Sequence, residues 1–97
     1  MSTMGRPAAS SDVFRAIADA TRRQIIDLLA ERPRTAGEIA ASFESCQSTV
    51  SEHLRILRQA SIVTFTETGG RRTYRLTPCP LGEVAAWSAR WQTRDCG

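Results

Sequence analysis

The sequence contains no lysine, one histidine and three cysteines in 97 residues, and these scarcities exclude several classes of protein. The cysteines (Cys46, Cys79 and Cys96) lie far apart and include no Cys-x-x-Cys pair, so neither a disulfide framework nor a zinc ribbon is expected. One histidine and no glycine-rich phosphate loop leave no group of residues that would make a catalytic site. We therefore expect a protein that is not an enzyme and carries no cofactor.

Long apolar runs are missing as well. No stretch of about 18 apolar residues occurs, and the first residues lack the apolar segment of a secretory signal, so we expect a cytoplasmic protein without a membrane span. The length of 97 residues suits a single domain. We assign residues 1–10 to a flexible tail, residues 11–94 to the domain and residues 95–97 to a second tail.

All 13 basic residues are arginine, with a net charge of +3 and a pI of about 9.2. The planar guanidinium group suits phosphate and guanine edges, although a base-composition bias of the source genome would give the same usage. The charge therefore permits a nucleic-acid partner without requiring one.

The central stretch, residues 35–60, is predicted to form a short helix, a polar turn and a longer helix. Thr35 and Glu38 have the spacing of a capping box at the start of the first helix. The turn covers residues 44–46. The second helix carries an apolar stripe that must be buried, formed by Val50, Leu54 and Leu57. This order is typical of a helix-turn-helix.

The opposite face of the second helix is polar. At ~100° per residue, five side chains lie ~100° to ~200° from Val50. They are Ser48, Ser51, Glu52, Arg55 and Gln59, with Gln47 and Arg58 flanking them. The face fits a recognition helix on DNA, and the alternative is an ordinary helical hairpin with a solvated face.

Two helices are predicted before this stretch. The first begins at Ser11 or Asp12, and the second is capped by Asp19 and ends at Pro33. Arg22 and Arg23 lie near the positive end of the second helix dipole. They are therefore expected to meet an external anion or a local carboxylate, or else to form a solvated charge pair.

A β-hairpin and a last helix are predicted after it. Residues 62–67 and 72–76 alternate as strands around a turn at residues 68–70, and the tip carries Arg71 and Arg72. Such a basic hairpin after a helix-turn-helix is typical of a wing that rests on phosphates or enters a minor groove. The last helix covers about residues 81–93, and its Trp87 and Trp91 are predicted to close the core or to cover a partner chain.

Together, residues 13–29, 35–43, 48–63, 69–76 and the Trp-bearing helix resemble the ArsR/SmtB family of winged helix-turn-helix transcriptional repressors. The likeness spans about residues 12–92 and is greatest to the small SdpR-type members. The motifs that carry it are Asp-x-Thr-Arg-Arg at 19–23 and Ser-x-His-Leu at 51–54.

The resemblance implies a mainly α fold with a β-hairpin, dimeric through the first and last helices. It implies a homodimeric repressor that binds double-stranded DNA at a pseudo-palindromic operator. Family residues at or beside DNA correspond to Gln47, Ser48, Thr49, Ser51, Glu52 and His53. We add Arg55, Arg71 and Arg72 from the polar helix face and the hairpin tip.

Two departures from the family pattern matter. Cys46 replaces the usual serine at the helix N-cap, and Ser48 replaces the usual proline. Glu52 stands where a neutral or basic residue is common, and it either accepts a hydrogen bond from a cytosine amine or lowers non-specific affinity.

The metal sites of the family do not carry over, so no metal is expected. The first helix of the motif has no cysteine pair, and the terminal helix has no histidine. His53 lies ~60° from the apolar stripe and is expected to be structural or DNA-adjacent. An alternative is sensing of arsenicals or thiol-reactive ligands by Cys46, or by Cys79 of one chain with Cys96 of its partner. Another is a winged-helix protein-interaction module. The inducer is unknown.

Overall fold

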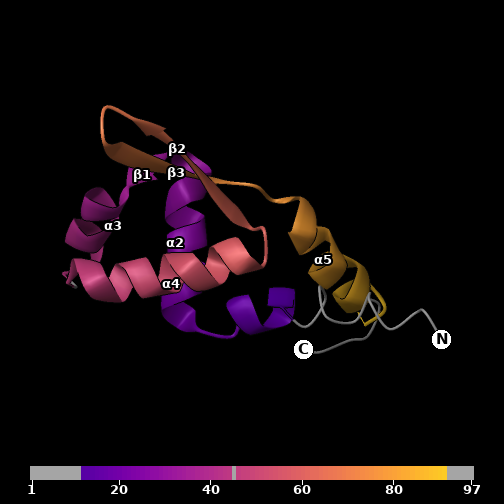
Figure 1. Ribbon diagram of the computed structural model, residues 1–97. Helices are drawn as coiled ribbons and strands as arrows, with labels where there is room; N and C mark the ends of the chain where they lie inside the picture. The colour runs from indigo at the N-terminus through magenta and orange to yellow at the C-terminus, as the bar shows by residue number, and fades with distance from the viewer. Residues whose placement is uncertain (1–11, 45, 92–97) are drawn as a thin grey trace.

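The computed structural model describes residues 12–44 and 46–91, and they form a mainly helical fold with a small antiparallel sheet (Figure 1). A helical stretch at residues 12–16 comes first. The elements that follow are α2 (Ala20–Glu31), β1 (Arg34–Thr35), α3 (Ala36–Phe43), α4 (Gln47–Gln59), β2 (Val63–Thr68), β3 (Arg71–Leu76), a 3-10 turn η2 (Cys79–Leu81) and α5 (Gly82–Ala89). The predicted order of helices around a hairpin is confirmed. The predicted tails, residues 1–10 and 95–97, lie outside the described residues.

Side-chain caps fix the starts of α2 and α3, as the sequence predicted. The Asp19 carboxylate accepts a hydrogen bond from the backbone N–H of Arg22 at 3.1 Å. In α3, the Glu38 N–H donates to Thr35 Oγ1 at 3.2 Å, and the Thr35 N–H donates to Glu38 Oε1 at 2.9 Å. This reciprocal pair satisfies two N–H groups that lack partners within the helix.

The core lies where α2, α3 and α4 meet beneath the hairpin (Figure 1). Val50, Leu54 and Leu57 are buried, which confirms the predicted stripe of α4. They pack with Ile25 and Leu29 of α2, Ile39 of α3, and Ile62, Val63 and Tyr74 at the hairpin. The helix-turn-helix is therefore held rigidly, and its polar face is left outside.

The sheet has three strands in the order β1-β3-β2, whereas the sequence predicted two. β1 pairs Arg34 with Tyr74 and Thr35 with Thr73. A strand of two residues has no alternating pattern, so it leaves no sequence signal. The hairpin turn is also shorter than predicted, because Thr68 and Arg71 pair and only Gly69 and Gly70 remain, with φ of 58° and 78°. Positive φ at both residues suits a two-residue hairpin turn.

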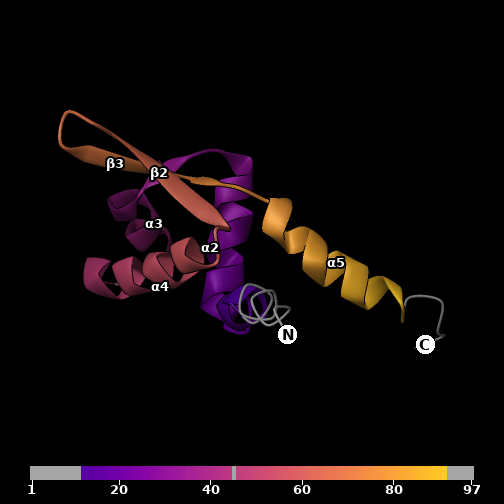
Figure 2. The ribbon, with the colours of Figure 1, turned by 45° about the vertical axis from the view of Figure 1, so that its right-hand side comes forward.

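The last helix differs most from its prediction. α5 ends at Ala89, and residues 92–97 lie outside the described part of the chain. Figure 2 shows α5 projecting away from the helix-turn-helix. Trp87 and Trp91 are 50% and 49% exposed, so they do not close the core of a single chain. The Trp87 ring makes an edge contact with Phe14, 5.8 Å between centroids, which holds α5 against the first helix. No described helix is long and apolar enough to cross a membrane.

Candidate nucleic-acid interface

The outward face of α4 is polar and exposed along its whole length. Most of the predicted contact residues are exposed, namely Gln47, Ser48, Thr49, Ser51, Glu52 and Arg55. His53 is the exception, because it is half-buried on the edge that faces α2. The burial of Val50, Leu54 and Leu57 sets this orientation, since a helix that buries one stripe must present the opposite one.

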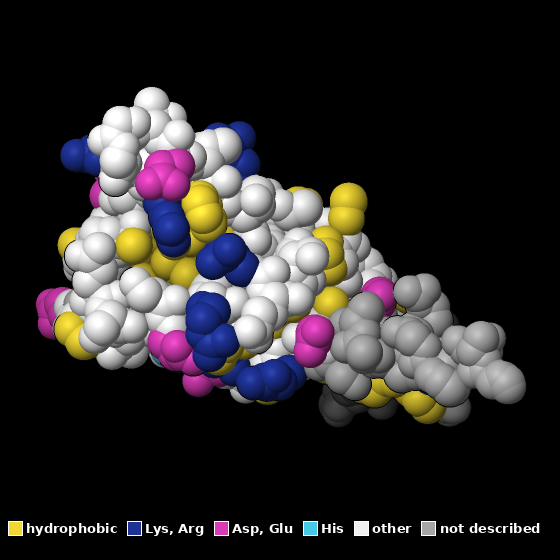
Figure 3. Space-filling model, viewed as in Figure 1, with side chains coloured by type: hydrophobic (Ala, Val, Ile, Leu, Met, Phe, Trp, Pro, Cys, Tyr) yellow, Lys and Arg dark blue, Asp and Glu magenta, His cyan; other side chains and the backbone are white. Residues whose placement is uncertain are grey.

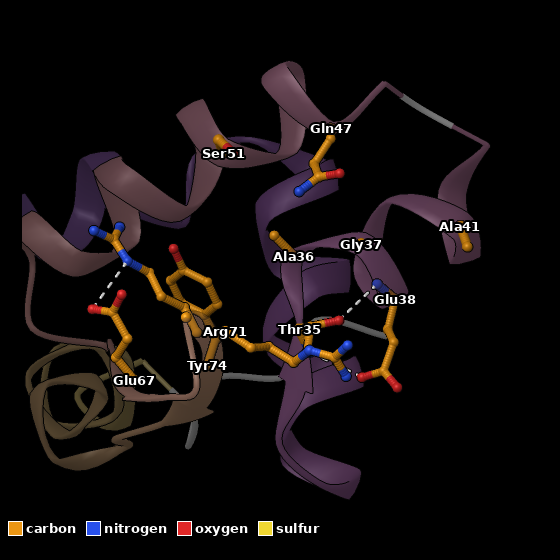
Figure 4. A pocket seen from close by; sticks show the side chains of 12 residues that line it. Thr35, Ala36, Gly37, Glu38, Ala41, Gln47, Ser51, Glu67, Arg71 and Tyr74 are labelled. Carbon is orange, nitrogen blue, oxygen red and sulfur yellow. Dashed lines mark hydrogen bonds and ion pairs between the residues drawn. The ribbon is translucent and has the colours of Figure 1, made fainter.

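A groove of about 770 Å³ separates α4 and the start of α3 from the hairpin. Figure 4 shows Gln47 and Ser51 of α4 on one side, with Tyr74 and Arg71 of β3 across from them. Much of the remaining lining comes from Thr35 of β1, Gly37 and Glu38 at the start of α3, and Glu67 of β2. The fold therefore brings four predicted site residues to one open groove, namely Gln47, Ser51, Arg71 and Arg72.

Arg72 lies one pair back from the hairpin turn, where it faces Glu67 across the strands. Its guanidinium stacks over the Phe65 ring at 4.4 Å from the centroid, and Arg58 of α4 approaches the same ring at 4.7 Å. Glu67 Oε1 lies 3.9 Å from Arg72 Nε. Arg72, predicted as part of the hairpin tip and first residue of the returning strand, is thus the second residue of β3, because β3 begins one residue earlier than predicted. Figure 3 shows several basic side chains on the face in view, with acidic side chains among them.

Arg55 is paired with Glu52 one turn earlier on α4. Its Nε donates to Glu52 Oε1 at 3.2 Å, and a second guanidinium N–H donates to the other carboxylate oxygen. These hydrogen bonds lower the pKa of Glu52 and raise the pKa of Arg55. Both side chains are about half exposed, so the pair contributes little stability, but it fixes where the guanidinium lies.

Cys46 occupies the N-cap of α4, as predicted, but without a side-chain bond to the helix N–H groups. Its Sγ lies 3.3 Å from Ser48 Oγ and 3.1 Å from Thr49 Oγ1. Hydrogen bonds from these hydroxyls, Ser48 first, lower the pKa of Cys46 to about 7. The two hydroxyls thus stabilise the thiolate of Cys46.

The structure also locates the other residues that were considered for sensing or anion binding. Cys79 is exposed in the 3-10 turn before α5, and Cys96 lies outside the described residues. No cluster of three metal-ligating side chains occurs within residues 12–44 and 46–91. Arg22 and Arg23 both donate to backbone carbonyl oxygens at the end of the first helix. The backbone N–H and the charge of Arg22 also lower the pKa of the nearby Asp19 carboxylate, in line with the predicted local carboxylate. Sequence spacing gave no signal for the carbonyl contacts, because they join separate elements.

Comparison with known proteins identifies a family to which this chain is similar. The family model described as "Bacterial regulatory protein, arsR family" matches residues 19–64. The transcriptional repressor SdpR of Bacillus subtilis is 39% identical over 77 residues, which cover 79% of this chain and 86% of SdpR. The HTH-type transcriptional regulator Rv2034 of Mycobacterium tuberculosis is 37% identical over 81 residues, covering 84% and 76%.

Solved structures agree with the sequence relatives. The homodimeric winged helix-turn-helix DNA-binding domain of Mb0332 from Mycobacterium bovis, a possible ArsR-family regulator, superposes with a TM-score of 0.72. It is 26% identical, and the match covers 93% of this chain and 89% of that domain. With this fold and these relatives, the chain belongs to the arsR family of bacterial regulatory proteins.

Proposed function

We propose that this protein is a transcriptional repressor that binds a pseudo-palindromic DNA operator as a homodimer. The observation that carries the proposal is the exposed polar face of α4 beside the groove, with Gln47 and Ser51 opposite the arginines of the hairpin. An α-helix of this kind fits the major groove, while a flanking hairpin rests on the backbone. The relatives, which are transcriptional regulators, support the same function.

In this proposal the position of each residue determines whether it contacts bases or phosphates. Gln47, Ser48 and Ser51 lie in the N-terminal half of α4, the part of a recognition helix that contacts base edges. Arg71 and Arg72 lie on the hairpin, where a guanidinium suits phosphate oxygens. Base contacts select the sequence, and phosphate contacts fix the register and supply much of the affinity.

Dimerisation through the first helix and α5 is supported by the two exposed tryptophans. Trp87 on α5 and Trp91 directly after it leave about half of their surface to solvent, and α5 buries none of its residues. Large apolar side chains exposed together are typical of a surface that another protein covers. A second copy is the partner we propose, because the related Mycobacterium bovis domain is homodimeric.

The proposal is tested by selecting duplexes from a random-sequence pool with the wild-type chain and then with variants. Ser51→Ala and Gln47→Ala are expected to relax the preference at particular base pairs, at a cost of about 1–3 kcal/mol each. Gln59→Ala is the matched control, because Gln59 is exposed at the C-terminal end of the same helix. A wild-type chain that enriches no sequence would overturn the proposal.

A second candidate is regulation through Cys46, which the lowered pKa of this exposed thiol favours. The thiolate reacts with oxidants and trivalent arsenicals, and the product would place bulk or charge at the start of α4. Peroxide or an arsenical is then expected to weaken operator binding by the wild type but not by Cys46→Ser. Equal loss in both proteins would exclude Cys46.

A further inference from the structure

The side chain of Arg22 contacts both the first helix and α4. It lies in the first turn of α2, and its Nε donates to the Ala16 carbonyl oxygen at 2.8 Å. Its Nη2 donates to the Arg15 carbonyl oxygen at 3.2 Å, and its Nη1 lies 3.3 Å from Nδ1 of His53 on α4. One guanidinium thus contacts two elements outside its own helix.

The contact with the first helix has a clear physical cause. The carbonyl groups of residues 15 and 16 lie in the last turn of the helical stretch 12–16, where carbonyls lack full partners within the helix. That end of a helix carries partial negative charge, which a cation stabilises. Arg22 therefore acts as a C-terminal cap for the first helix, supplied by the following helix.

The contact with α4 fixes the form of the histidine. A guanidinium donates hydrogen bonds and cannot accept them, so Nδ1 of His53 must be the acceptor and the ring proton must lie on Nε2. His53 and Ser51 are two residues apart and point ~160° away from each other around α4. Holding His53 therefore adds to the buried stripe a second restraint on the rotation of the face that carries Ser51.

The first helix also contacts α5, through the edge contact of Phe14 with Trp87. A continuous set of contacts thus leads from the proposed dimer surface through the first helix and Arg22 to the recognition helix. A change in how the first helix lies in the dimer would reach α4 at His53. Such a route needs a coupling measurement, since adjacency alone does not establish one.

We propose that Arg22 is a positioning residue for DNA recognition, which ties α4 to the dimer-forming first helix through His53. The proposal rests on the proposed function and adds that neither residue needs to touch DNA. Its chemical requirement is a donor fork at residue 22 and an acceptor at the Nδ1 position of residue 53.

Arg23 offers a matched control. It is the next residue of α2, and its Nη1 donates to the Ile17 carbonyl oxygen at 2.7 Å, again at the end of the first helix. Within the described residues it makes no bond to α4. Arg22→Met and Arg23→Met therefore remove the same charge. Both also remove contacts with backbone carbonyls at the end of the first helix, those of Ala16 and Arg15 in Arg22→Met and that of Ile17 in Arg23→Met. Only Arg22→Met removes the link to His53.

Two variants of His53 test the acceptor directly. The amide oxygen of His53→Asn lies near the Nδ1 position and can accept from Arg22, whereas the amide of His53→Gln reaches one bond further, near Nε2. If the ring of His53 only filled space, the DNA affinities of the two variants would not depend on the position of the acceptor. They also keep the test open if Arg22→Met fails to fold.

The full-length proteins are titrated with a duplex selected by the wild type from a random-sequence pool, after sedimentation and thermal unfolding confirm folded dimers. We expect Arg22→Met to bind about tenfold more weakly, and Arg23→Met within about twofold of the wild type. His53→Asn should bind at least about fivefold more tightly than His53→Gln. The Arg22→Met/His53→Gln double variant should lose less than the sum of the single losses, because one interaction is removed twice.

Equal affinity losses in Arg22→Met and Arg23→Met would overturn the link to α4, and so would His53→Asn and His53→Gln proteins of equal affinity. Failure of the wild-type chain to select any duplex would instead overturn the proposed function itself. The two failures are therefore distinguishable in one set of titrations.

Discussion

Cys46 shows how one residue acquires reactivity from its neighbours. Two hydroxyls, from Ser48 and Thr49, lie within 3.3 Å of its sulfur and stabilise the thiolate, which lowers the pKa of Cys46 to about 7. An exposed thiol with this pKa is about half ionised at neutral pH, so it reacts faster there than an ordinary cysteine, whose pKa is about 8.5.

The labelling of Cys46 should follow this pKa. In a chain carrying Cys79→Ser and Cys96→Ser, the rate of alkylation by iodoacetamide is expected to rise through a midpoint near pH 7. Because the hydroxyls are the cause, adding Ser48→Ala and Thr49→Ala should move the midpoint upward. A midpoint of about 8.5 in the parent chain would contradict the assignment.

Two roles were considered for Glu52, a hydrogen bond from a cytosine amine and a lowering of non-specific affinity, and the structure suggests how to separate them. Its carboxylate bonds the Arg55 guanidinium within the same helix, so in the free protein it restrains a cation on the proposed DNA face. We expect Glu52→Gln to bind an unrelated duplex several-fold more tightly at low salt, since a phosphate-repelling charge is lost. Asp27→Asn, with the same change of charge on α2, is the control. If Glu52→Gln instead weakened binding of the selected duplex and left binding of the unrelated duplex unchanged, a base contact by Glu52 would be favoured.

Among the elements, α3 was predictable down to its cap. Thr35→Ala is expected to lower the free energy of unfolding by about 1 kcal/mol, because the Glu38 N–H loses its acceptor. Ser42→Ala serves as the control, since its hydroxyl bonds only the Glu38 carbonyl of its own helix. Thermal unfolding of the two variants measures the difference. Equal stability of Thr35→Ala and the wild type would show that the capping box adds nothing.

The hairpin should act on all DNA sequences alike. Arg71→Ala and Arg72→Ala are each expected to weaken binding to selected and unrelated duplexes equally, and to reduce the slope of log affinity against log salt by about one. The control is Arg90→Ala, directly after α5, which projects away from the hairpin in Figure 2, and sedimentation must first show that this variant remains dimeric, because Arg90 lies over the Trp91 ring. An unchanged salt slope for both hairpin variants would remove the wing from the interface.

Local signals explain which elements could be predicted. The Thr35–Glu38 spacing, the buried stripe of α4 and the glycines of the hairpin are each visible within a few residues. β1 was missed because it is defined by its pairing with β3, more than thirty residues away. The candidate site was predictable where it follows helix rotation, as at Ser51. The stacking of Arg72 on Phe65 and the contact of Arg22 with His53 were not predictable, because the partners lie on other elements.

The whole molecule is expected to be a dimer. Sedimentation at micromolar concentration is expected to show a species of about twice the monomer mass of 10.7 kDa, because the half-exposed Trp87 and Trp91 need a covering surface. Trp87→Glu should shift the species toward monomer, whereas Trp87→Phe keeps an aromatic ring against Phe14 and should remain dimeric. A wild-type chain that stays monomeric would exclude this interface.

The central claim is that two copies of α4 and the hairpin read a DNA sequence. A mobility-shift titration of the duplex upstream of this protein's own coding region, repeated at several salt concentrations, tests it most directly. The account predicts a complex of two chains per duplex that weakens steeply with salt and survives an excess of unrelated competitor DNA. A complex displaced equally well by any sequence, or no complex at low salt, would contradict it.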